Sequence, residues 1–433
     1  MERIWSSELA AHVGERATIA GWLHRFRHQR QVSFLILRDG RGLTQVVVED
    51  RGLAEHIAAL NHESVLSITG TVVAEPQAPG GVEIHNPKIE VVSAAIEPPP
   101  FDLFRPELQV QLPTRLDHAA VGLRHPRTQA LFALQHALVT GFRSTLIERG
   151  FTEIHSPKIV AAATESGANV FPIDYFGQTA YLAQSPQLYK QTMVGVFERV
   201  FEVGPVFRAE PHDTARHLNE YTSLDVETGF ITDHRDVMSL LEHVIHAMLD
   251  AVGPSLRERL ASFGIALPLL PAQFPSIHFT DALELVSREL GEDVTAEPDL
   301  APAHERILGE WAKRWFNSDA LFIEGYPAAK RPFYTHPDPE RPGYTNGFDL
   351  LFRGLELVTG GQRLHRYDEY IAALSARQLS PLGLEWYLEA FKHGMPPHGG
   401  FAIGLERFVA RIAGLDNIRL ATLFPRDINR LTP

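Results

Sequence analysis

The sequence contains no cysteine and only six lysines among its 433 residues. The absence of cysteine excludes disulfide bonds, thiolate metal sites and a cysteine nucleophile. No apolar run approaches the roughly 18 residues that a membrane span needs. The N-terminal segment carries Glu2 and Glu8 and no apolar core, so we expect no signal peptide and no membrane partner. With 44% hydrophobic and 21% charged residues, the composition predicts a globular protein, which we place in the cytoplasm.

Common nucleotide and metal motifs are also missing. No Gly-Lys pair occurs, which excludes a P-loop. No HExxH zinc motif is present, and no G-x-G-x-x-G sequence follows a predicted strand. Any nucleotide site must therefore use scattered arginines and acids instead of a glycine cradle.

The net charge of −13 argues against unspecific binding of nucleic acid, but the charge is unevenly distributed. Residues 21–41 contain five arginines and a single acid, Asp39, with His24 and His28 between them. A solvated loop face would explain such a run, and local contact with phosphates is the alternative.

The hydrophobic pattern changes along the chain. Alternating segments at 17–26, 32–39, 43–50, 65–75 and 88–94 predict five strands, which suit a small oligonucleotide-binding (OB) barrel. The proline-rich stretch 97–100 then predicts a linker, and from about residue 128 the period becomes helical, ending near Gly150. We therefore expect an OB-fold domain at 1–100, a linker or hinge at 101–127, and an α/β catalytic domain at 128–433 with a less legible insertion near 250–320.

Three segments carry polar side chains in patterns that indicate one site. In FRAEPHDTARHLNEYTSLDVE (207–227), alternation places the four side chains from Tyr221 to Glu227 on one face of a strand. In GLELVTGGQRLHRYDEY (354–370), the same reasoning places Glu356, Val358 and Gly360 on one face. GGFAIGLERF (400–409) predicts a strand that enters a helix near Gly404. Arg407 in the first turn of that helix opposes the helix dipole, which indicates an anion or a stacked ring nearby.

These segments resemble the motifs of class II aminoacyl-tRNA synthetases, and among them the aspartyl enzymes of archaeal type. GFTEIHSPKI (150–159) resembles motif 1, with Pro157 at a dimer interface, and the first and last of the three segments resemble motifs 2 and 3. QSPQLYKQ (184–191) resembles the aspartate-binding segment. The resemblance extends from the barrel to the ending LFPRDINRLTP. It implies an N-terminal OB-fold barrel followed by an antiparallel sheet flanked by helices.

The resemblance also implies roles in binding ATP and magnesium. Arg208 would hold the α-phosphate and the reacting carboxylate, and Glu210 would accept from the adenine amino group. Tyr221 and Arg407 would sandwich adenine, and Glu356 with Thr359 would ligate Mg²⁺. Arg208, Arg407 and Glu356 are the expected catalytic residues. The remaining expected ATP contacts are Arg216 and His217 for the β- and γ-phosphates, with Leu218 and Gly404.

The amino-acid pocket points to L-aspartate. Lys190 and Arg363 would pair with the side-chain carboxylate of the substrate, and Gln187 and Asp225 would bind its α-ammonium region. Glu165 would close over the substrate from a loop. The expected aspartate-binding set also includes Arg208 and Thr359.

For the tRNA, the resemblance points to His24 and Pro79 as the residues that read the third anticodon base. Strict enzymes of this type carry Trp and Lys there, so we predict charging of both tRNA(Asp) and tRNA(Asn), the latter feeding an amidotransferase. The alternative is that His24 is an ordinary residue of a basic face and that 76–81 is merely a turn. The sequence also leaves open a strictly discriminating aspartyl enzyme, an asparaginyl enzyme, an ammonia-dependent asparagine synthetase and a non-catalytic paralogue. A homodimer is expected.

Overall fold

The computed structural model describes residues 2–27, 31–161 and 169–433, and its contacts divide the chain into two compact units. The first unit comprises residues 1–130 with Pro433, and the second comprises residues 131–432. The division falls inside helix α4 (Pro126–Glu148), close to the expected start of the catalytic domain at 128. Within the described residues, no helix is long and apolar enough to cross a membrane.

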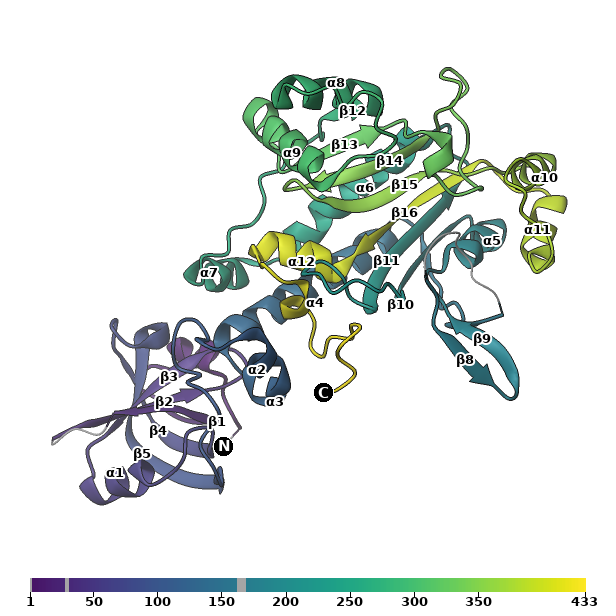
Figure 1. Ribbon diagram of the computed structural model, residues 1–433. Helices are drawn as coiled ribbons and strands as arrows, with labels where there is room; N and C mark the ends of the chain where they lie inside the picture. The colour runs from purple at the N-terminus through teal and green to yellow at the C-terminus, as the bar shows by residue number, and fades with distance from the viewer. Residues whose placement is uncertain (1, 28–30, 162–168) are drawn as a thin grey trace. The chain divides into compact units, whose positions relative to one another are not determined.

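The first unit contains the predicted five-stranded barrel, closed in the order β1-β2-β3-β5-β4 (Figure 1). Its last strand begins at Val82 instead of residue 88, because VEIHN continues the pairing with β4. Five short helical elements in this unit were not predicted from the sequence. The elements are η1 (Ser6–His12), β1 (Arg16–Arg27), β2 (Ser33–Arg38), β3 (Leu43–Val48), α1 (Arg51–Ala58), β4 (Val65–Ala74), η2 (Pro79–Gly81), β5 (Val82–Ser93), α2 (Leu112–Asp117) and α3 (Ala119–Gly122).

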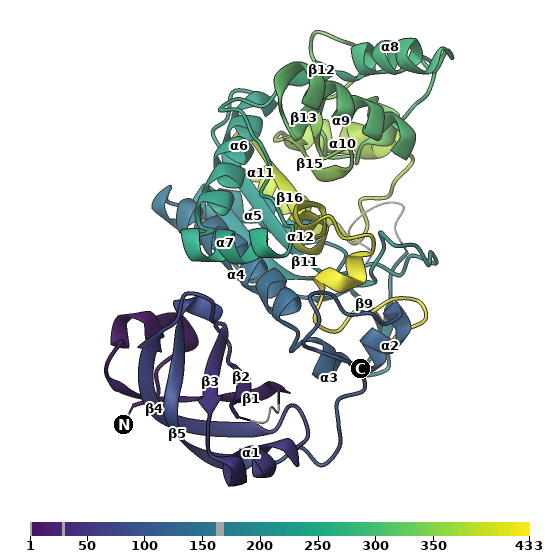
Figure 2. The ribbon, with the colours of Figure 1, turned by 90° about the vertical axis from the view of Figure 1, so that its left-hand side faces the viewer.

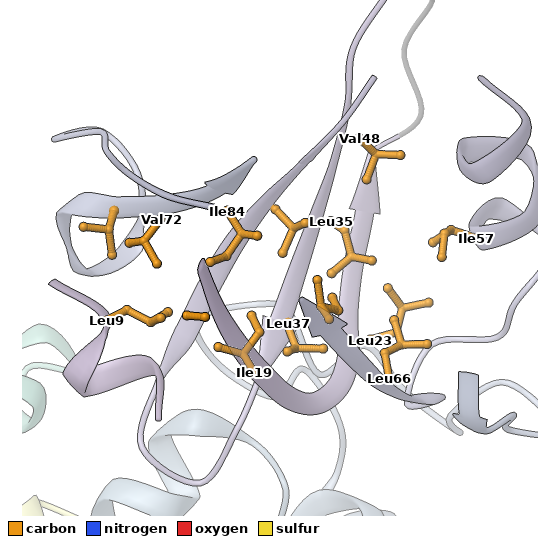
Figure 3. Close-up of a cluster of buried hydrophobic side chains, with 14 of the residues drawn as sticks. Leu9, Ile19, Leu23, Leu35, Leu37, Val48, Ile57, Leu66, Val72 and Ile84 are labelled. Atoms are coloured by element: carbon orange, nitrogen blue, oxygen red, sulfur yellow. The ribbon is translucent and has the colours of Figure 1, made fainter. Parts of the chain in front are cut away.

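Alternating apolar residues of the strands fill the barrel. In Figure 3, Leu23 and Leu66 lie near Ile57 of α1, while Leu9, Val72 and Ile84 lie at the other end of the core. All of these side chains are at most 4% exposed, and β1 and β4 pair antiparallel from Arg16↔Thr71 to Trp22↔Val65. The two ends of β4 are therefore also the two ends of the barrel core.

The second unit contains an eight-stranded sheet in the order β12-β13-β14-β15-β16-β11-β10-β6 (Figure 1). Its central strands are antiparallel, as expected, and only the two edge pairs, β12-β13 and β10-β6, are parallel. The strands are β6 (Thr152–Glu153), β10 (Arg199–Phe207), β11 (Glu220–Gly229), β12 (Ser276–His278), β13 (Ala320–Glu324), β14 (Gly347–Phe352), β15 (Glu356–Gln362) and β16 (His398–Gly404). A separate sheet contains β7 (Ile159–Val160), β8 (Pro172–Tyr175) and β9 (Gln178–Leu182).

Helices cover this sheet (Figure 2). α6 packs against β14, β15 and β16, while α5 and α12 contact β11 and β16. The less legible region around 250–320 folds into α7, β12, α8 and α9. Apolar residues of α8 and α9 form a core of their own with β12 and β13. α10 and α11 enclose a further aromatic cluster. The helices are α5 (Gln187–Phe197), α6 (His234–Asp250), α7 (Pro254–Ser262), α8 (Phe279–Leu290), α9 (Pro302–Phe316), α10 (Tyr367–Ala376), α11 (Glu385–Lys392) and α12 (Leu405–Ala413), with η3 (Ala328–Lys330) and η4 (Ile418–Ala421).

Candidate active site

A cavity of about 290 Å³ lies over strands β11, β15 and β16. These strands come from distant parts of the sequence, but β16 pairs with both β11 and β15, so the three sequence segments meet there. Most of the expected site residues line this cavity. They are Gln187, Arg208, Glu210, Arg216, His217, Leu218, Tyr221, Asp225, Glu356, Thr359, Arg363, Gly404 and Arg407.

The alternation predicted for β11 is present. Tyr221, Ser223 and Asp225 line the cavity, and Glu227 continues the same face beneath it with 0% exposure. Nine consecutive pairs with β10, from Arg199↔Thr228 to Phe207↔Glu220, keep this strand in regular register. One face of β11 therefore carries polar groups from the mouth of the cavity to its floor.

The helix predicted near Gly404 begins at Leu405, and Arg407 lies in its first turn. The Arg407 guanidinium donates from Nη1 to the carbonyl oxygen of Glu356 at 3.1 Å. Its neighbour Glu406 is buried and accepts from the Thr222 amide at 3.0 Å, which joins α12 to β11. Burial raises the pKa of Glu406 to about 7. The two segments expected to surround adenine are thus joined by a hydrogen bond.

The expected common face of Glu356, Val358 and Gly360 is wrong. The pairing of β14 with β15 shifts between Leu350↔Val358 and Leu351↔Glu356, so one additional residue is inserted in β15. Val358 therefore lies in the core at 1% exposure, while Glu356 and Thr359 both line the cavity. The Thr359 hydroxyl donates to Glu356 Oε1 at 3.3 Å. The bulge is what brings the two expected metal ligands together.

The oxygen groups around Glu356 suit magnesium. Burial and the neighbouring Asp349 raise the pKa of Glu356 to about 7. The positive charges of Arg407 and Arg331 lower this pKa but do not offset the two effects. Asp349 pairs across the strands with Thr359 and forms an ion pair with Arg331 at 2.8 Å. Among the described residues, no three His, Asp or Glu side chains form a complete metal site. A Mg²⁺ ion here would complete its coordination with substrate phosphates and water, which is its usual preference.

Two cations and two carboxylates meet at the floor of the cavity. Arg363 Nε donates to Glu227 Oε1 at 3.0 Å, and Lys190 Nζ lies 3.0 Å from Asp225 Oδ1 and 3.4 Å from Glu227 Oε2. Lys190 is 1% exposed and lies behind the lining residues, whereas Arg363 lines the cavity. Arg363 and Lys190 lower the pKa of Glu227 against the effect of its burial. The floor of the cavity therefore contains as many basic as acidic side chains, each within 3.4 Å of a group of opposite sign.

Gly400 makes room for this cluster. A Cβ at that position would lie 2.2 Å from Glu227 Oε2 and 2.0 Å from the Val226 carbonyl oxygen, so no side chain fits there. Arg363 Nη2 also donates to the Gly400 carbonyl oxygen at 3.0 Å. Gly400, which the sequence shows only as a flank of the strand, is thus part of the floor.

Sequence reasoning missed several residues of the site. Arg331 and Tyr334 line the cavity from the segment 330–335, and the Arg363 guanidinium lies 5.6 Å from the centre of the Tyr334 ring. Ser223 was predicted on the polar face of β11 but given no role, and its hydroxyl donates to Asp225 Oδ2 at 2.5 Å. The segment KRPFYT has no periodic pattern, and only its combination of arginine and tyrosine beside a proline could have drawn attention to it.

The expected aspartate-binding residue Glu165 lies outside the described residues. The two expected anticodon residues, His24 and Pro79, belong to the barrel unit. His24 is 6% exposed in the barrel, where Arg38 Nη1 donates to its Nδ1 at 3.0 Å, and Arg38 also forms a double hydrogen bond with Glu63 at 2.7 Å. Burial and Arg38 lower the pKa of His24 to about 4, so its ring is neutral with the hydrogen on Nε2.

His24 and Pro79 are not brought together. His24 follows Trp22, which pairs with Val65 at the beginning of β4, whereas Pro79 lies in η2 after the end of β4 at Ala74. Ten residues of strand separate these ends, which is on the order of 30 Å along the strand. The structure therefore places the two expected anticodon residues near opposite ends of β4.

Comparison with known proteins agrees with this architecture. Residues 111–428 match the family model "tRNA synthetases class II (D, K and N)", and residues 17–92 match the model "OB-fold nucleic acid binding domain". The chain therefore belongs to the class II tRNA synthetases of the D, K and N family.

Two full-length curated relatives carry the same name. The aspartate--tRNA(Asp/Asn) ligase of Thermus thermophilus is 47% identical over 431 residues, with 100% of both chains covered. The ligase of the same name from Archaeoglobus fulgidus is 39% identical, also with 100% of both chains covered.

Solved structures of both amino-acid specificities resemble the chain. The asparaginyl-tRNA synthetase of Pyrococcus horikoshii with asparaginyl-adenylate has a TM-score of 0.91 and 32% identity, covering 100% of both chains. A putative aspartyl-tRNA synthetase from Leishmania major has a TM-score of 0.90 and 30% identity, covering 100% of this chain and 95% of that one. The overall fold therefore does not distinguish aspartate from asparagine, and the pocket residues must.

Proposed function

We propose that this protein attaches L-aspartate to tRNA in an ATP-dependent reaction and that it charges both tRNA(Asp) and tRNA(Asn). The observation that carries the amino-acid assignment is the buried pair of cations, Lys190 and Arg363, at the floor of the cavity. The Arg363 guanidinium can form charge-assisted hydrogen bonds with the side-chain carboxylate of aspartate, whereas asparagine would place a neutral amide there. The names of the full-length relatives support the same assignment.

The first chemical step is the attack of the aspartate α-carboxylate on the α-phosphorus of ATP. Arg208 orients the carboxylate and the phosphate, while Tyr221 and Arg407 hold the adenine ring between them. Gln187 and Asp225 bind the α-ammonium region, and Glu165 closes over the substrate. The products are aspartyl-adenylate and pyrophosphate, and no side chain serves as a nucleophile.

Glu356 and Thr359 would hold Mg²⁺, which supplies positive charge to the phosphates when it is bound. Glu210, Arg216, His217 and Leu218 extend the ATP site from the loop between β10 and β11. His217 Nε2 lies 3.4 Å from Glu210 Oε2, so these two side chains already face each other.

In the second step, the 3′-hydroxyl of the terminal ribose of tRNA takes the aspartyl group. We attribute the relaxed reading of the anticodon to two residues of the barrel, His24 and Pro79. The third anticodon base is C in tRNA(Asp) and U in tRNA(Asn). Cytosine presents an amino group that donates a hydrogen bond where uracil presents a carbonyl oxygen that accepts one. His24 is buried and Pro79 has no side-chain donor, so neither provides an exposed group that would favour one base.

The remaining parts of the proposal concern assembly. We expect a two-fold homodimer with Pro157 at its interface, because Pro157 and Ile159 are both exposed in the single chain. The aspartyl-tRNA(Asn) product would be a substrate for an amidotransferase. We expect the enzyme and the amidotransferase to be located in the cytoplasm.

Two measurements test the proposal. ATP–pyrophosphate exchange should depend on aspartate and not on asparagine, and the reverse result would indicate an asparaginyl enzyme, as the similarity to the Pyrococcus structure allows. Charging of purified tRNA(Asp) and tRNA(Asn) transcripts should proceed with similar efficiency. A more than thousandfold preference for tRNA(Asp) would contradict the relaxed specificity.

A further inference from the structure

Helix α9, from the region of the sequence that suggested no function, reaches the ATP half of the site. It lies beside β13 and β14 (Figure 1). Glu305 in its first turn is 8% exposed, and its Oε2 accepts a hydrogen bond from the backbone amide of Glu356 at 2.9 Å. A carboxylate at the start of a helix normally accepts a hydrogen bond from a backbone amide of the same helix. The Glu305 carboxylate instead accepts one from the backbone amide of Glu356, which belongs to a strand.

The helix approaches the turn between β14 and β15 without intervening side chains. A Cβ on Gly309 would lie 2.6 Å from Gly354 Cα, and a Cβ on Gly354 would lie 3.1 Å from Arg306 Cα. Gly354 also has a φ of +70°, which favours glycine. Glu305 and Gly309 are four residues apart and therefore share one face of α9. The contact is thus a backbone-to-backbone fit with a single hydrogen bond at its end.

Glu356 is held from the other side by residues of α12. Its carbonyl oxygen accepts from Arg407 Nη1 at 3.1 Å, while its amide donates to Glu305. The neighbouring Arg353 donates from Nη1 to the carbonyl oxygens of Arg411 and Ile412 at 3.1 and 2.9 Å, near the end of α12. The main chain that carries the Glu356 carboxylate is therefore fixed between two helices.

We propose that Glu305 is a positioning residue for ATP with its Mg²⁺ ion. Its hydrogen bond to the Glu356 amide sets where the Glu356 carboxylate and the Arg407 guanidinium meet the nucleotide. This inference rests on the proposed function, because it takes Glu356 as the metal ligand and Arg407 as the adenine contact. It assigns a role to the region 250–320, in which helix α9 holds the bulged start of β15 in place.

The test compares variants of helix α9. Glu305→Ala removes the acceptor, and Glu305→Gln keeps an amide oxygen that can accept from the same amide. Glu310→Ala is the matched control, because Glu310 is exposed on the same helix. Calorimetric binding of ATP is measured over a series of Mg²⁺ concentrations without amino acid, and exchange kinetics give the KM values for ATP and aspartate. Circular dichroism checks the fold.

We expect Glu305→Ala to weaken ATP binding in the presence of Mg²⁺ by about 10- to 100-fold, the effect of losing a hydrogen bond to a charged group. It should also raise the Mg²⁺ concentration needed for half-maximal binding and leave the KM for aspartate within about threefold. Glu305→Gln and Glu310→Ala should bind ATP within about threefold of the unmodified protein. Gly309→Ala, which forces the helix away from the turn, should resemble Glu305→Ala.

A folded Glu305→Ala protein that binds ATP and Mg²⁺ normally would overturn the proposal. So would a Glu305→Gln protein as impaired as Glu305→Ala, since charge and not position would then be the cause. If Glu305→Ala fails to fold, ATP binding by Gly309→Ala over the same series of Mg²⁺ concentrations tests the proposal in its place. Failure of the proposed function gives a different result, namely an unmodified protein that binds ATP but shows no aspartate-dependent exchange.

Discussion

Replacement of Lys190 by methionine should abolish aspartate activation. Methionine is unbranched like lysine but is one atom shorter and uncharged, so the change leaves Asp225 and Glu227, at 2% and 0% exposure, without the Lys190 ammonium. Breaking a buried ion pair by removing one partner costs about 3–5 kcal/mol. The same loss in the transition state for activation corresponds to a roughly 200- to 5000-fold lower rate of exchange with aspartate.

The assay must separate a lost binding group from a weakened fold. Glu227→Gln in the Lys190→Met background removes one of the two opposed carboxylates, so it should recover part of the free energy of unfolding without recovering exchange. ATP binding, measured by calorimetry, should remain near normal in both proteins, because Lys190 does not line the ATP half of the cavity. Near-normal exchange in Lys190→Met would refute the reasoning and remove the basis for assigning aspartate.

Three further predictions concern other parts of the molecule. His24→Trp with Pro79→Lys should raise the preference for tRNA(Asp) over tRNA(Asn) in charging assays, and an unchanged ratio would count against a role for these positions. Light scattering at micromolar concentration should give the mass of a dimer, and a monomer mass would contradict the expected interface at Pro157. Burial raises the pKa of Glu406 from 4.5 to about 7, so between these pH values the folded protein keeps a proton that the unfolded chain has lost, and its free energy of unfolding falls as pH rises. Glu406→Gln should flatten this dependence in urea titrations at different pH, and an identical slope would show that Glu406 does not cause it.

Local patterns were sufficient for the barrel and for β11. Strands with a regular period of two reveal which side chains share a face, so the row from Tyr221 to Glu227 could be predicted from the sequence alone. The start of the helix at Leu405 was predictable for a similar reason, because a glycine-flanked strand led directly into a helical pattern.

The bulge in β15 could not be predicted, because it depends on how β14 pairs with it. A single inserted residue reverses which side chains face the cavity, and this exchanged Val358 for Thr359. The contribution of Arg331 was equally hidden, since it depends on a loop that reaches the site only after the sheet has formed. The task of Glu305 depends on a close approach between two glycines, Gly309 and Gly354, that no periodic pattern indicates.

The place of β16 in the sheet has a consequence for synthesis of the chain on the ribosome. β16 is the last strand to be made, yet it lies in the middle of the sheet, between β15 and β11. Until residues 398–404 have left the ribosome, β11 and β15 each present an unpaired edge, and unpaired edges invite pairing with other chains. Contacts this distant in sequence also form slowly. We therefore expect nascent chains that stop before residue 398 to bind chaperones and to lack the nucleotide site altogether, whatever the state of the barrel.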